Sequence, residues 1–375
     1  MQAPYCIMFL LGTRAEALKL APVIKIMKAN EMIWQPVVVT APYLQQNDLL
    51  SQALDYLQIE PDFELATVDK NGQRVEELSQ LLHNLDNVVN ASQPDMLLVV
   101  GDASTSLAAS LVGFYHQLPI SHVEAGLRTY DKLSPFPDEM HRRLTDDLAD
   151  LYFAPTAHAR DNLLAEHHPA ERIYVTGNTS IDMVNNTLDQ PFDSELLDQI
   201  PEDHRMIILT MERPENIGEP MRAVFHTVKD IVETNEDVEL IYPVFPNADV
   251  ESMADEILGK HDRIHLIKPL DHGSFIHMAA RSTLIITDSG SIQEEAPALH
   301  KPVLLLREKT ERQEAVDCGA VKVVGTNPTS IQQTVFDLLN HHKAYKQMAE
   351  AENRFGDGHA SEHICAIIED YLQQH

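Results

Sequence analysis

The sequence predicts an α/β fold with two doubly wound parallel sheets. Short apolar runs alternate with segments of helical periodicity through the first half of the chain, and the same rhythm resumes after residue 200. Between the halves, residues 177–205 contain paired asparagines and two prolines that interrupt the pattern. The length of 375 residues also exceeds the size, about 250–300 residues, at which single cores stop growing. We therefore expect two domains.

Each expected strand is an apolar run bounded by turn residues or by a helical pattern. In the first half the runs are YCIMFLL, WQPVVVT, DMLLVV and LPISHVE, at residues 5–11, 34–40, 95–100 and 118–124. Helical patterns lie between them, for example over 16–30 and 105–117. In the second half the runs lie at residues 206–210, 239–244, 263–268, 283–288, 301–306 and 321–325.

The same pattern gives the expected domain boundaries. We predict a first domain over residues 1–180, a hinge over 181–200 and a second domain over 201–355. The last segment, 356–375, has helical periodicity and could pack back onto the first domain.

Composition narrows the class of protein. There are 58 acidic residues against 28 Lys and Arg, a formal charge of −30, which disfavours partners such as nucleic acid and anionic membranes. The three cysteines, Cys6, Cys318 and Cys365, are unclustered, which is typical of a reducing, cytoplasmic compartment rather than a disulfide framework. The histidines are scattered without a metal-ligand spacing, so we predict no metal.

Two strand ends suggest anion binding. LLGTRAEALK, residues 10–19, combines a strand end, a glycine turn and a helix start with Arg14 and Lys19, although a plain helix start would look similar. In TDSGSIQEEAP, residues 287–297, a diphosphate could lie against Ser289 and Gly290 while Glu295 accepts hydrogen bonds from ribose hydroxyls. The alternative is that these carboxylates only complement the helix dipole.

Acidic residues also follow strands of the first domain. Asp102, Glu124 and Asp138 would each individually be read as an N-cap or a surface charge. Together they could surround one cleft, where converging carboxylates raise one another's pKa and can transfer protons near neutral pH. In the second domain LTMERPENIG, residues 209–218, places Glu212 and Arg213 just after a strand, where ligands of such sheets bind.

Nine motifs resemble the bacterial non-hydrolysing UDP-N-acetylglucosamine 2-epimerases, in the family's order from residue 12 to 362. They are GTRAEALKLAPVI, VVGDASTSLAAS, HVEAGLRT, SPFPDEMHRRLTD, YFAPTAHARDNLL, VTGNTSID, TDSGSIQEEAPALHKPVLLLR, TERQEAV and FGDGHASE. The resemblance implies two Rossmann-like domains of the glycosyltransferase-B type with a cleft between them, a UDP-binding second domain, a homodimer, and neither metal nor nicotinamide cofactor.

The resemblance also implies a reaction and its residues. UDP leaves C1 as the C2 proton is lost, giving 2-acetamidoglucal, and returns as a proton is delivered to the other face, which interconverts UDP-N-acetylglucosamine and UDP-N-acetylmannosamine. Asp102, Glu124 and Asp138 match the family's three catalytic acids, Asp138 being one methylene shorter than the usual Glu. The matches to its substrate-binding positions are Arg14, Lys19, Ser289, Gly290, Glu295, Arg312 and, near the uracil, Phe275.

The departures from the family pattern centre on the loop after residue 210. The family's GHRRES corresponds to a stretch in which Met211 replaces Gly, Glu212 replaces the catalytic His and Pro214 replaces the second Arg, while Arg213 is kept. Smaller changes are Ala15 for Pro and Ser291 for Gly. An ionised carboxylate beside a diphosphate adds like-charge repulsion, where an imidazole could donate a hydrogen bond.

The family's regulatory site is altered as well, since Pro42, Tyr43 and Leu44 stand for its QHR signature and Phe245 for its His. We therefore expect turnover without activation by a second UDP-N-acetylglucosamine. Two alternatives to a weakened epimerase remain open: a UDP-sugar enzyme with hydrolysing or otherwise changed chemistry, and a catalytically silent UDP-sugar binder that supports an authentic epimerase.

Overall fold

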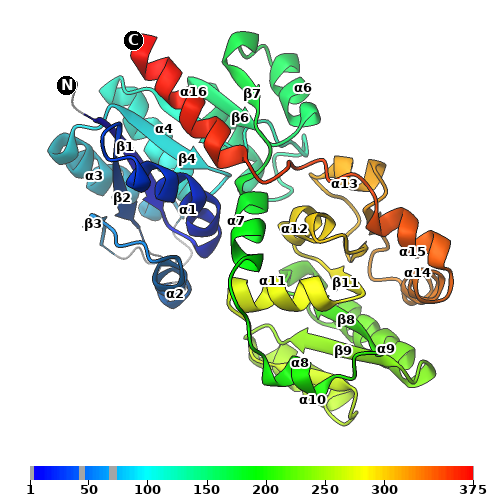
Figure 1. The fold of residues 1–375 in the computed structure, drawn as a ribbon. Coiled ribbons are helices and arrows are strands. Elements are labelled where there is room, and N and C mark those ends of the chain that lie inside the picture. Colours follow the sequence, from blue (N-terminus) through cyan, green and yellow to red (C-terminus); the bar gives the residue numbers. More distant parts are fainter. Residues whose placement is uncertain (1–3, 42–46, 67–73, 375) are drawn as a thin grey trace. The chain divides into compact units, whose positions relative to one another are not determined.

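The computed structural model describes residues 4–41, 47–66 and 74–374, which divide into two compact units. Unit 1 contains the described residues up to Met183 together with those from Phe355 onward, and unit 2 is Val184–Arg354. Each unit is built on one parallel sheet with helices along it (Figure 1). The predicted α/β class with two parallel sheets is therefore confirmed.

Within the described residues, the sheet of unit 1 has seven strands in the order β3-β2-β1-β4-β5-β6-β7, and all its pairings are parallel. Its strands are β1 (Tyr5–Leu11), β2 (Trp34–Thr40), β3 (Phe63–Glu64), β4 (Met96–Val100), β5 (Ile120–Val123), β6 (Leu151–Ala154) and β7 (Ile173–Val175). The helices are α1 (Arg14–Ala29), α2 (Asn47–Leu57), α3 (Arg74–Ser92), α4 (Ser104–His116), α5 (Asp138–Leu148), α6 (Ala157–Ala165), the 3₁₀ turn η1 (Ala170–Arg172) and α16 (Ala360–Gln374).

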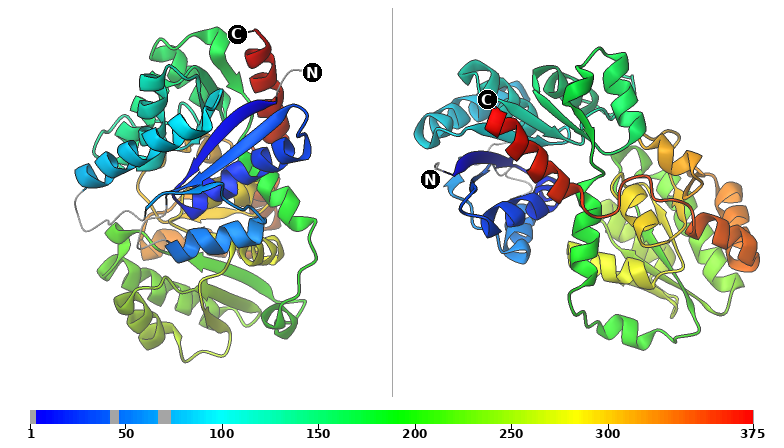
Figure 2. Two further views of the ribbon diagram at one scale, coloured as in Figure 1. Left: turned by 90° about the vertical axis from the view of Figure 1, so that its left-hand side faces the viewer. Right: turned by 45° about the horizontal axis from the view of Figure 1, so that its top comes forward.

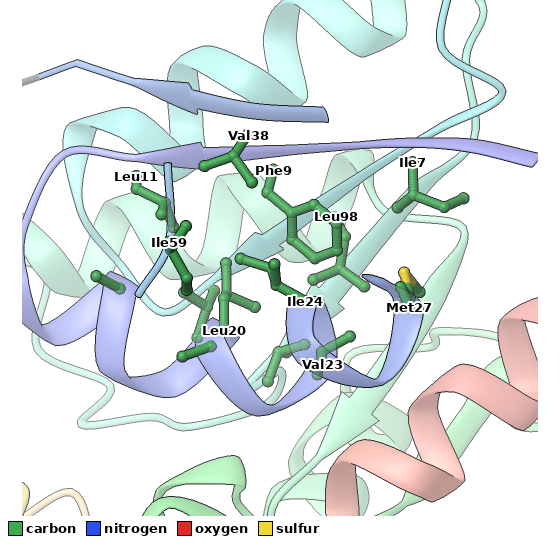
Figure 3. Packing of buried hydrophobic residues seen from close by; sticks show 14 of the residues in the cluster. Ile7, Phe9, Leu11, Leu20, Val23, Ile24, Met27, Val38, Ile59 and Leu98 are labelled. Atoms are coloured by element: carbon green, nitrogen blue, oxygen red, sulfur yellow. The ribbon is translucent and has the colours of Figure 1, made fainter. Parts of the chain in front are cut away.

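Alternating side chains of β1 face two separate cores. Ile7, Phe9 and Leu11 point toward α1 (Figure 3), whereas the intervening residues join a second cluster on the opposite face. Because both faces are covered by helices, the strand is apolar throughout, as expected for a parallel sheet. A wholly buried leucine such as Leu20 of α1 contributes about 1.5–3 kcal/mol to stability through its burial.

The C-terminal helix α16 packs against α1 within unit 1 (Figure 2). Its residues Ile364 and Ile368 are wholly buried and belong to the same cluster as Leu20. Asp182 accepts hydrogen bonds from the backbone N–H groups of Ala360 and Ser361, at 3.2 and 2.7 Å, and so caps the start of α16. Unit 1 is therefore completed by residues from the end of the chain.

In the described part of unit 2, six strands run in the order β10-β9-β8-β11-β12-β13, again all parallel. The strands are β8 (Arg205–Thr210), β9 (Val238–Pro243), β10 (Ile264–Ile267), β11 (Leu284–Thr287), β12 (Val303–Leu305) and β13 (Val321–Val323). The helices are α8 (Glu195–Gln199), the 3₁₀ turn η2 (Pro214–Asn216), α9 (Glu219–Thr234), α10 (Ala248–Leu258), α11 (His272–Arg281), α12 (Ile292–Ala298), α13 (Gln313–Asp317), α14 (Pro328–Asn340) and α15 (His342–Ala349). Side chains of β8, α9, α10 and α14 share one core.

The segment predicted as a hinge, 181–200, contains helical structure. Helix α7 (Thr179–Leu188) carries the chain from unit 1 into unit 2, and α8 follows it. Ile181 and Val184 of α7 are buried, so an apolar face exists within an otherwise polar stretch. None of the helices in the described ranges combines the length and apolar character needed to span a membrane.

Each sheet has one point at which the strand order reverses. This point lies between β1 and β4 in unit 1 and between β8 and β11 in unit 2. Loops at the carboxyl ends of such strand pairs form the usual ligand site of open α/β sheets. The two switch points therefore define where functional side chains are to be sought.

Candidate active site

The loop after β1 is locked to the start of α4 by one buried carboxyl group. Glu16 accepts hydrogen bonds from the backbone N–H of Gly12 and the hydroxyl of Thr13, both at 2.9 Å, and from the hydroxyl of Thr105. Burial raises the pKa of Glu16, and these hydrogen bonds oppose the rise. Arg14 is the first residue of α1 and is half-buried. The switch-point loops of β1 and β4 are thus held together.

Glu124, directly after β5, is fixed by two side chains from other elements. Its carboxylate accepts from Lys19 Nζ and from Asn178 Nδ2, both at 2.6 Å. Its backbone has φ +67°, in the left-handed region that costs a non-glycine residue about 1–3 kcal/mol. The structure therefore pairs Lys19, predicted as an anion-binding cation, with one of the predicted acids.

Asp102 follows a turn residue close to Glu124 and is tied to α5. A Cβ added at Gly101 would lie 3.3 Å from Glu124 Oε2, so the turn that carries Asp102 runs close to Glu124. The carboxylate of Asp102 forms an ion pair with the guanidinium of Arg142. Arg142 is one helical turn after Asp138, the first residue of α5. The segments carrying the three predicted acids therefore converge in unit 1.

In unit 2, Asp288 organises the loop after β8. The backbone N–H groups of Glu212 and Arg213 donate to its carboxylate at 3.0 and 3.1 Å, and Asn216 Nδ2 donates at 2.8 Å. Asp288 is wholly buried at the end of β11, the strand next to β8. The side chain of Glu212 is exposed.

The turn after β11 lies against Arg312. The N–H of Ser289 donates to Thr287 Oγ1 at 2.9 Å, so this amide is already engaged. A Cβ at Gly290 would lie 3.1 Å from Arg312 Nη1. Arg312 is buried and forms ion pairs with the carboxylates of Glu294 and Glu311. Its positive charge is therefore balanced within unit 2.

The remaining predicted residues lie on separate elements. Glu295 is a buried residue of α12, beside Glu294. Phe275 is half-buried on the first turn of α11, the helix between β10 and β11. Of the residues at the altered regulatory site, Phe245 is half-buried after β9, whereas 42–44 lie outside the described residues.

Several partners of the predicted residues were missed by sequence reasoning. Arg142, Asn178 and Asp288 all lie within motifs already quoted, but the pattern gave them no role. Position was a usable signal for Asp288, which is a polar residue directly after the buried strand β11.

Taken together, these features define a doubly wound α/β protein whose strand-end loops carry carboxylates and cations in the arrangement of an enzyme. The profile of the UDP-N-acetylglucosamine 2-epimerase family matches residues 25–369. The UDP-N-acetylglucosamine 2-epimerase of Bacillus subtilis strain 168 is 46% identical over 358 residues, covering 96% of this chain and 93% of that protein. The chain therefore belongs to the UDP-N-acetylglucosamine 2-epimerase family.

Solved structures agree with this assignment. The S. aureus MnaA–UDP co-structure superposes with a TM-score of 0.91 at 44% identity, covering 98% of this chain and 97% of that one. UDP-GlcNAc 2-epimerase from Neisseria meningitidis, solved bound to UDP-GlcNAc, has a TM-score of 0.90 at 35% identity, with 97% and 100% covered. The fold thus matches epimerase structures of the glycosyltransferase-B type.

Proposed function

We propose that the protein is a UDP-N-acetylglucosamine 2-epimerase that interconverts UDP-N-acetylglucosamine and UDP-N-acetylmannosamine, with activity weakened by Glu212. The observation that carries the proposal is the convergence of Asp102, Glu124 and the start of α5 at the switch-point side of unit 1. Family membership supports the substrate class.

The proposed reaction is an elimination followed by re-addition. A carboxylate removes the C2 proton while the C1–O bond to UDP breaks, which gives 2-acetamidoglucal and UDP. The same bond then re-forms while a proton is delivered to the opposite face of C2. Asp102, Glu124 and Asp138 are the proposed proton-transfer groups. Their support is that Glu124 is held by Lys19 and Asn178 at 2.6 Å, which fixes the direction of its carboxylate.

In this proposal unit 2 binds the nucleotide. The proposed contacts are Arg213, Ser289, Gly290, Glu295, Arg312 and Phe275, with Arg14 and Lys19 contributed by unit 1. The pairing of Arg312 with two carboxylates supports an orienting role for its guanidinium, because its charge is already offset. The proposal includes a homodimer, whose mass sedimentation would measure, and no metal or nicotinamide cofactor.

Glu212 is the feature that weakens the enzyme in this proposal. An ionised carboxylate at this position would repel a departing diphosphate, and it lacks the hydrogen-bond donor that an imidazole would present. Loss of a single preorganised donor costs about 10²–10³ in kcat in other enzymes. Glu212→His should therefore raise kcat at neutral pH by at least about tenfold, with UDP affinity nearly unchanged.

Proton NMR in deuterated water tests the proposal with UDP-N-acetylglucosamine as substrate. Elimination and re-addition should place deuterium at C2 of both epimers. Glu215→His is the matched control, since Glu215 is also exposed in this loop, and it should leave the rate unchanged. A Glu212→His variant that binds UDP but is no faster than the parent would show that Glu212 is not the limiting defect.

The alternatives give distinct spectra in the same tube. Free N-acetylmannosamine would indicate hydrolysing chemistry, and bound but unchanged nucleotide sugar would indicate a silent binder. The altered regulatory residues predict hyperbolic kinetics with UDP-N-acetylmannosamine and no requirement for added UDP-N-acetylglucosamine. A strict requirement for the second sugar nucleotide would contradict that part of the proposal.

A further inference from the structure

A buried histidine lies directly behind the turns that carry the predicted acids. His122 is on β5 and is wholly buried. Its Nδ1 lies 2.6 Å from Asp146 Oδ1, and its Nε2 lies 2.9 Å from the carbonyl oxygen of Gly101. A carbonyl oxygen only accepts hydrogen bonds, so Nε2 must carry a proton.

Asp146, the partner of His122 Nδ1, has two further partners. Asp146 Oδ2 accepts from Arg128 Nη2 at 2.7 Å and from the N–H of Gly126 at 3.2 Å. Burial by itself would raise the pKa of Asp146, but the charges and hydrogen bonds of His122 and Arg128 lower it below its usual range. Asp146 therefore joins His122, Arg128 and the N–H of Gly126 in one buried network.

The remaining charges around this pair keep the network balanced. Arg128 forms a second ion pair with Glu166, at 2.6 Å. Arg128 thus bridges the carboxylates of Asp146 and Glu166, so its buried charge is compensated. Tyr152 of β6 stays neutral, because burial and the charge of Asp146 raise its pKa.

We propose that His122 is a positioning residue of the active site, whose two ring nitrogens bridge the Gly101 turn and Asp146. Through Nε2 it holds the Gly101 turn that carries Asp102. Through Asp146 it holds the N–H of Gly126, two residues after Glu124, and helix α5. One buried pair therefore fixes the three segments on which the predicted acids lie. The proposal rests on the proposed function for its kinetic consequence.

Backbone conformation explains why these turns need such an anchor. Gly101, Glu124 and Gly126 have φ of +70°, +67° and +85°. The two glycines adopt positive φ without strain, but for Glu124 this region is sparsely populated and persists only where the surroundings hold it. Without the bond from Nε2, the Gly101 carbonyl would lose a buried partner and the turn could shift. A displacement of 1 Å at a reacting group can reduce rate by a factor on the order of 100.

Two substitutions separate the functions of the two ring nitrogens. The amide of His122→Asn can occupy the place of Nδ1 and keep Asp146, but it cannot reach Gly101. The amide of His122→Gln can occupy the place of Nε2 and keep Gly101. We expect kcat for epimerisation to fall on the order of 100-fold in His122→Asn with little change in KM or UDP affinity. His122→Gln should retain a clearly higher kcat.

A matched control removes a similar pair elsewhere. His204 Nδ1 lies 2.9 Å from Glu239 Oε1 in unit 2, so His204→Asn deletes a histidine–carboxylate contact remote from the acids in sequence and in its unit. Its kcat should equal that of the parent. If the two His122 variants lose kcat equally, and in proportion to their loss of melting temperature, the role of His122 is merely structural and the proposal is overturned. A His122→Asn variant with parental kcat would also overturn it.

A second measurement does not depend on activity. In protein labelled with ¹⁵N-histidine, long-range ¹H–¹⁵N spectra, assigned with His122→Gln, should show a proton on Nε2 of His122, the nitrogen that faces the Gly101 carbonyl oxygen. A ring whose Nε2 carries no proton overturns the proposal. If the parent protein fails to turn over the nucleotide sugar, the proposed function fails, and the state of the ring nitrogens alone decides this inference.

Discussion

Replacement of Asp288 by asparagine would test how the loop carrying Glu212 is held. In the parent the two carboxylate oxygens accept from the N–H groups of Glu212 and Arg213 and from the amide of Asn216, at 2.8–3.1 Å. Asparagine keeps one acceptor oxygen and turns an NH₂ group toward these donors. The variant therefore loses the negative charge and at least one of the hydrogen bonds, and it sets a donor against a donor.

The size of the effect follows from these contacts. A hydrogen bond to a charged group contributes about 1.5–3 kcal/mol, and a buried polar group left unsatisfied costs about 1–3 kcal/mol. Because the loop amides are only partly buried, water can restore part of this loss. We expect the local stability of the loop to fall by about 2–4 kcal/mol, which corresponds to about a 30- to 900-fold loss of amide protection.

Native-state hydrogen exchange at the Glu212 and Arg213 amides is the assay. Asp237→Asn is the matched control, since it makes the same change in unit 2 at a carboxylate that binds the side chain of Arg205 on the surface. The control should leave protection of the loop unchanged. Parental protection in Asp288→Asn would refute the reasoning that this carboxylate, rather than the 3₁₀ turn η2, holds the loop.

Core packing, buried charge and backbone conformation each give a further prediction. Leu20→Ala should lower the unfolding free energy of unit 1 by about 2.7–5.0 kcal/mol. Urea unfolding can be followed by fluorescence of the single tryptophan, Trp34, which lies in the same cluster. An unchanged urea midpoint would contradict this prediction. Since the folded-state pKa of Asp146 is lowered, its stabilisation is complete above the unfolded pKa of about 3.9 and is lost as pH falls through the folded value. The gap in melting temperature between the parent and Asp146→Asn should therefore shrink below about pH 4, and a constant gap would refute it. Gly319→Ala and Gly126→Ala share φ near +85°, but only at Gly126 would the new Cβ lie 2.2 Å from a backbone carbonyl oxygen. Gly319→Ala should lower the unfolding free energy by about 1–2 kcal/mol, and Gly126→Ala should lower it clearly more. Equal losses of unfolding free energy in calorimetry would show that crowding by the new Cβ does not determine the effect.

The strands that were predicted correctly share a simple cause. Tyr5–Leu11 and Trp34–Thr40 are examples of long, mostly apolar runs. Strands of a parallel sheet that is covered on both faces are apolar along most of their length, so they can be recognised in the sequence. Strands β6 and β7 were not among the predicted runs. They have four and three residues, and Val175 at the end of β7 is exposed. Their place in the sheet is decided by pairing with neighbours rather than by local pattern.

For the candidate site, the sequence predicted where the acidic residues lie but not which side chains bind them. Strand-end location follows from topology, so Asp102 and Glu124 could be selected from the sequence. Their partners, Arg142 and Asn178, are 40 and 54 residues further along the chain. Such contacts depend on tertiary packing, and only the folded chain brings them together. The same is true of Asp288, which lies 76 residues beyond Glu212.

Unit 1 is formed by two separate segments of the chain, which the ribosome makes at different times. This affects how the protein folds in the cell. Unit 2, Val184–Arg354, is one continuous stretch, whereas unit 1 needs α16 to cover Leu20 and its neighbours. A ribosome releases all of unit 2 before it releases α16, and domains generally fold as units during translation. The nascent chain therefore holds an open apolar surface on α1 while unit 2 can already fold. During that interval unit 1 lacks the residues of α16 that complete its core.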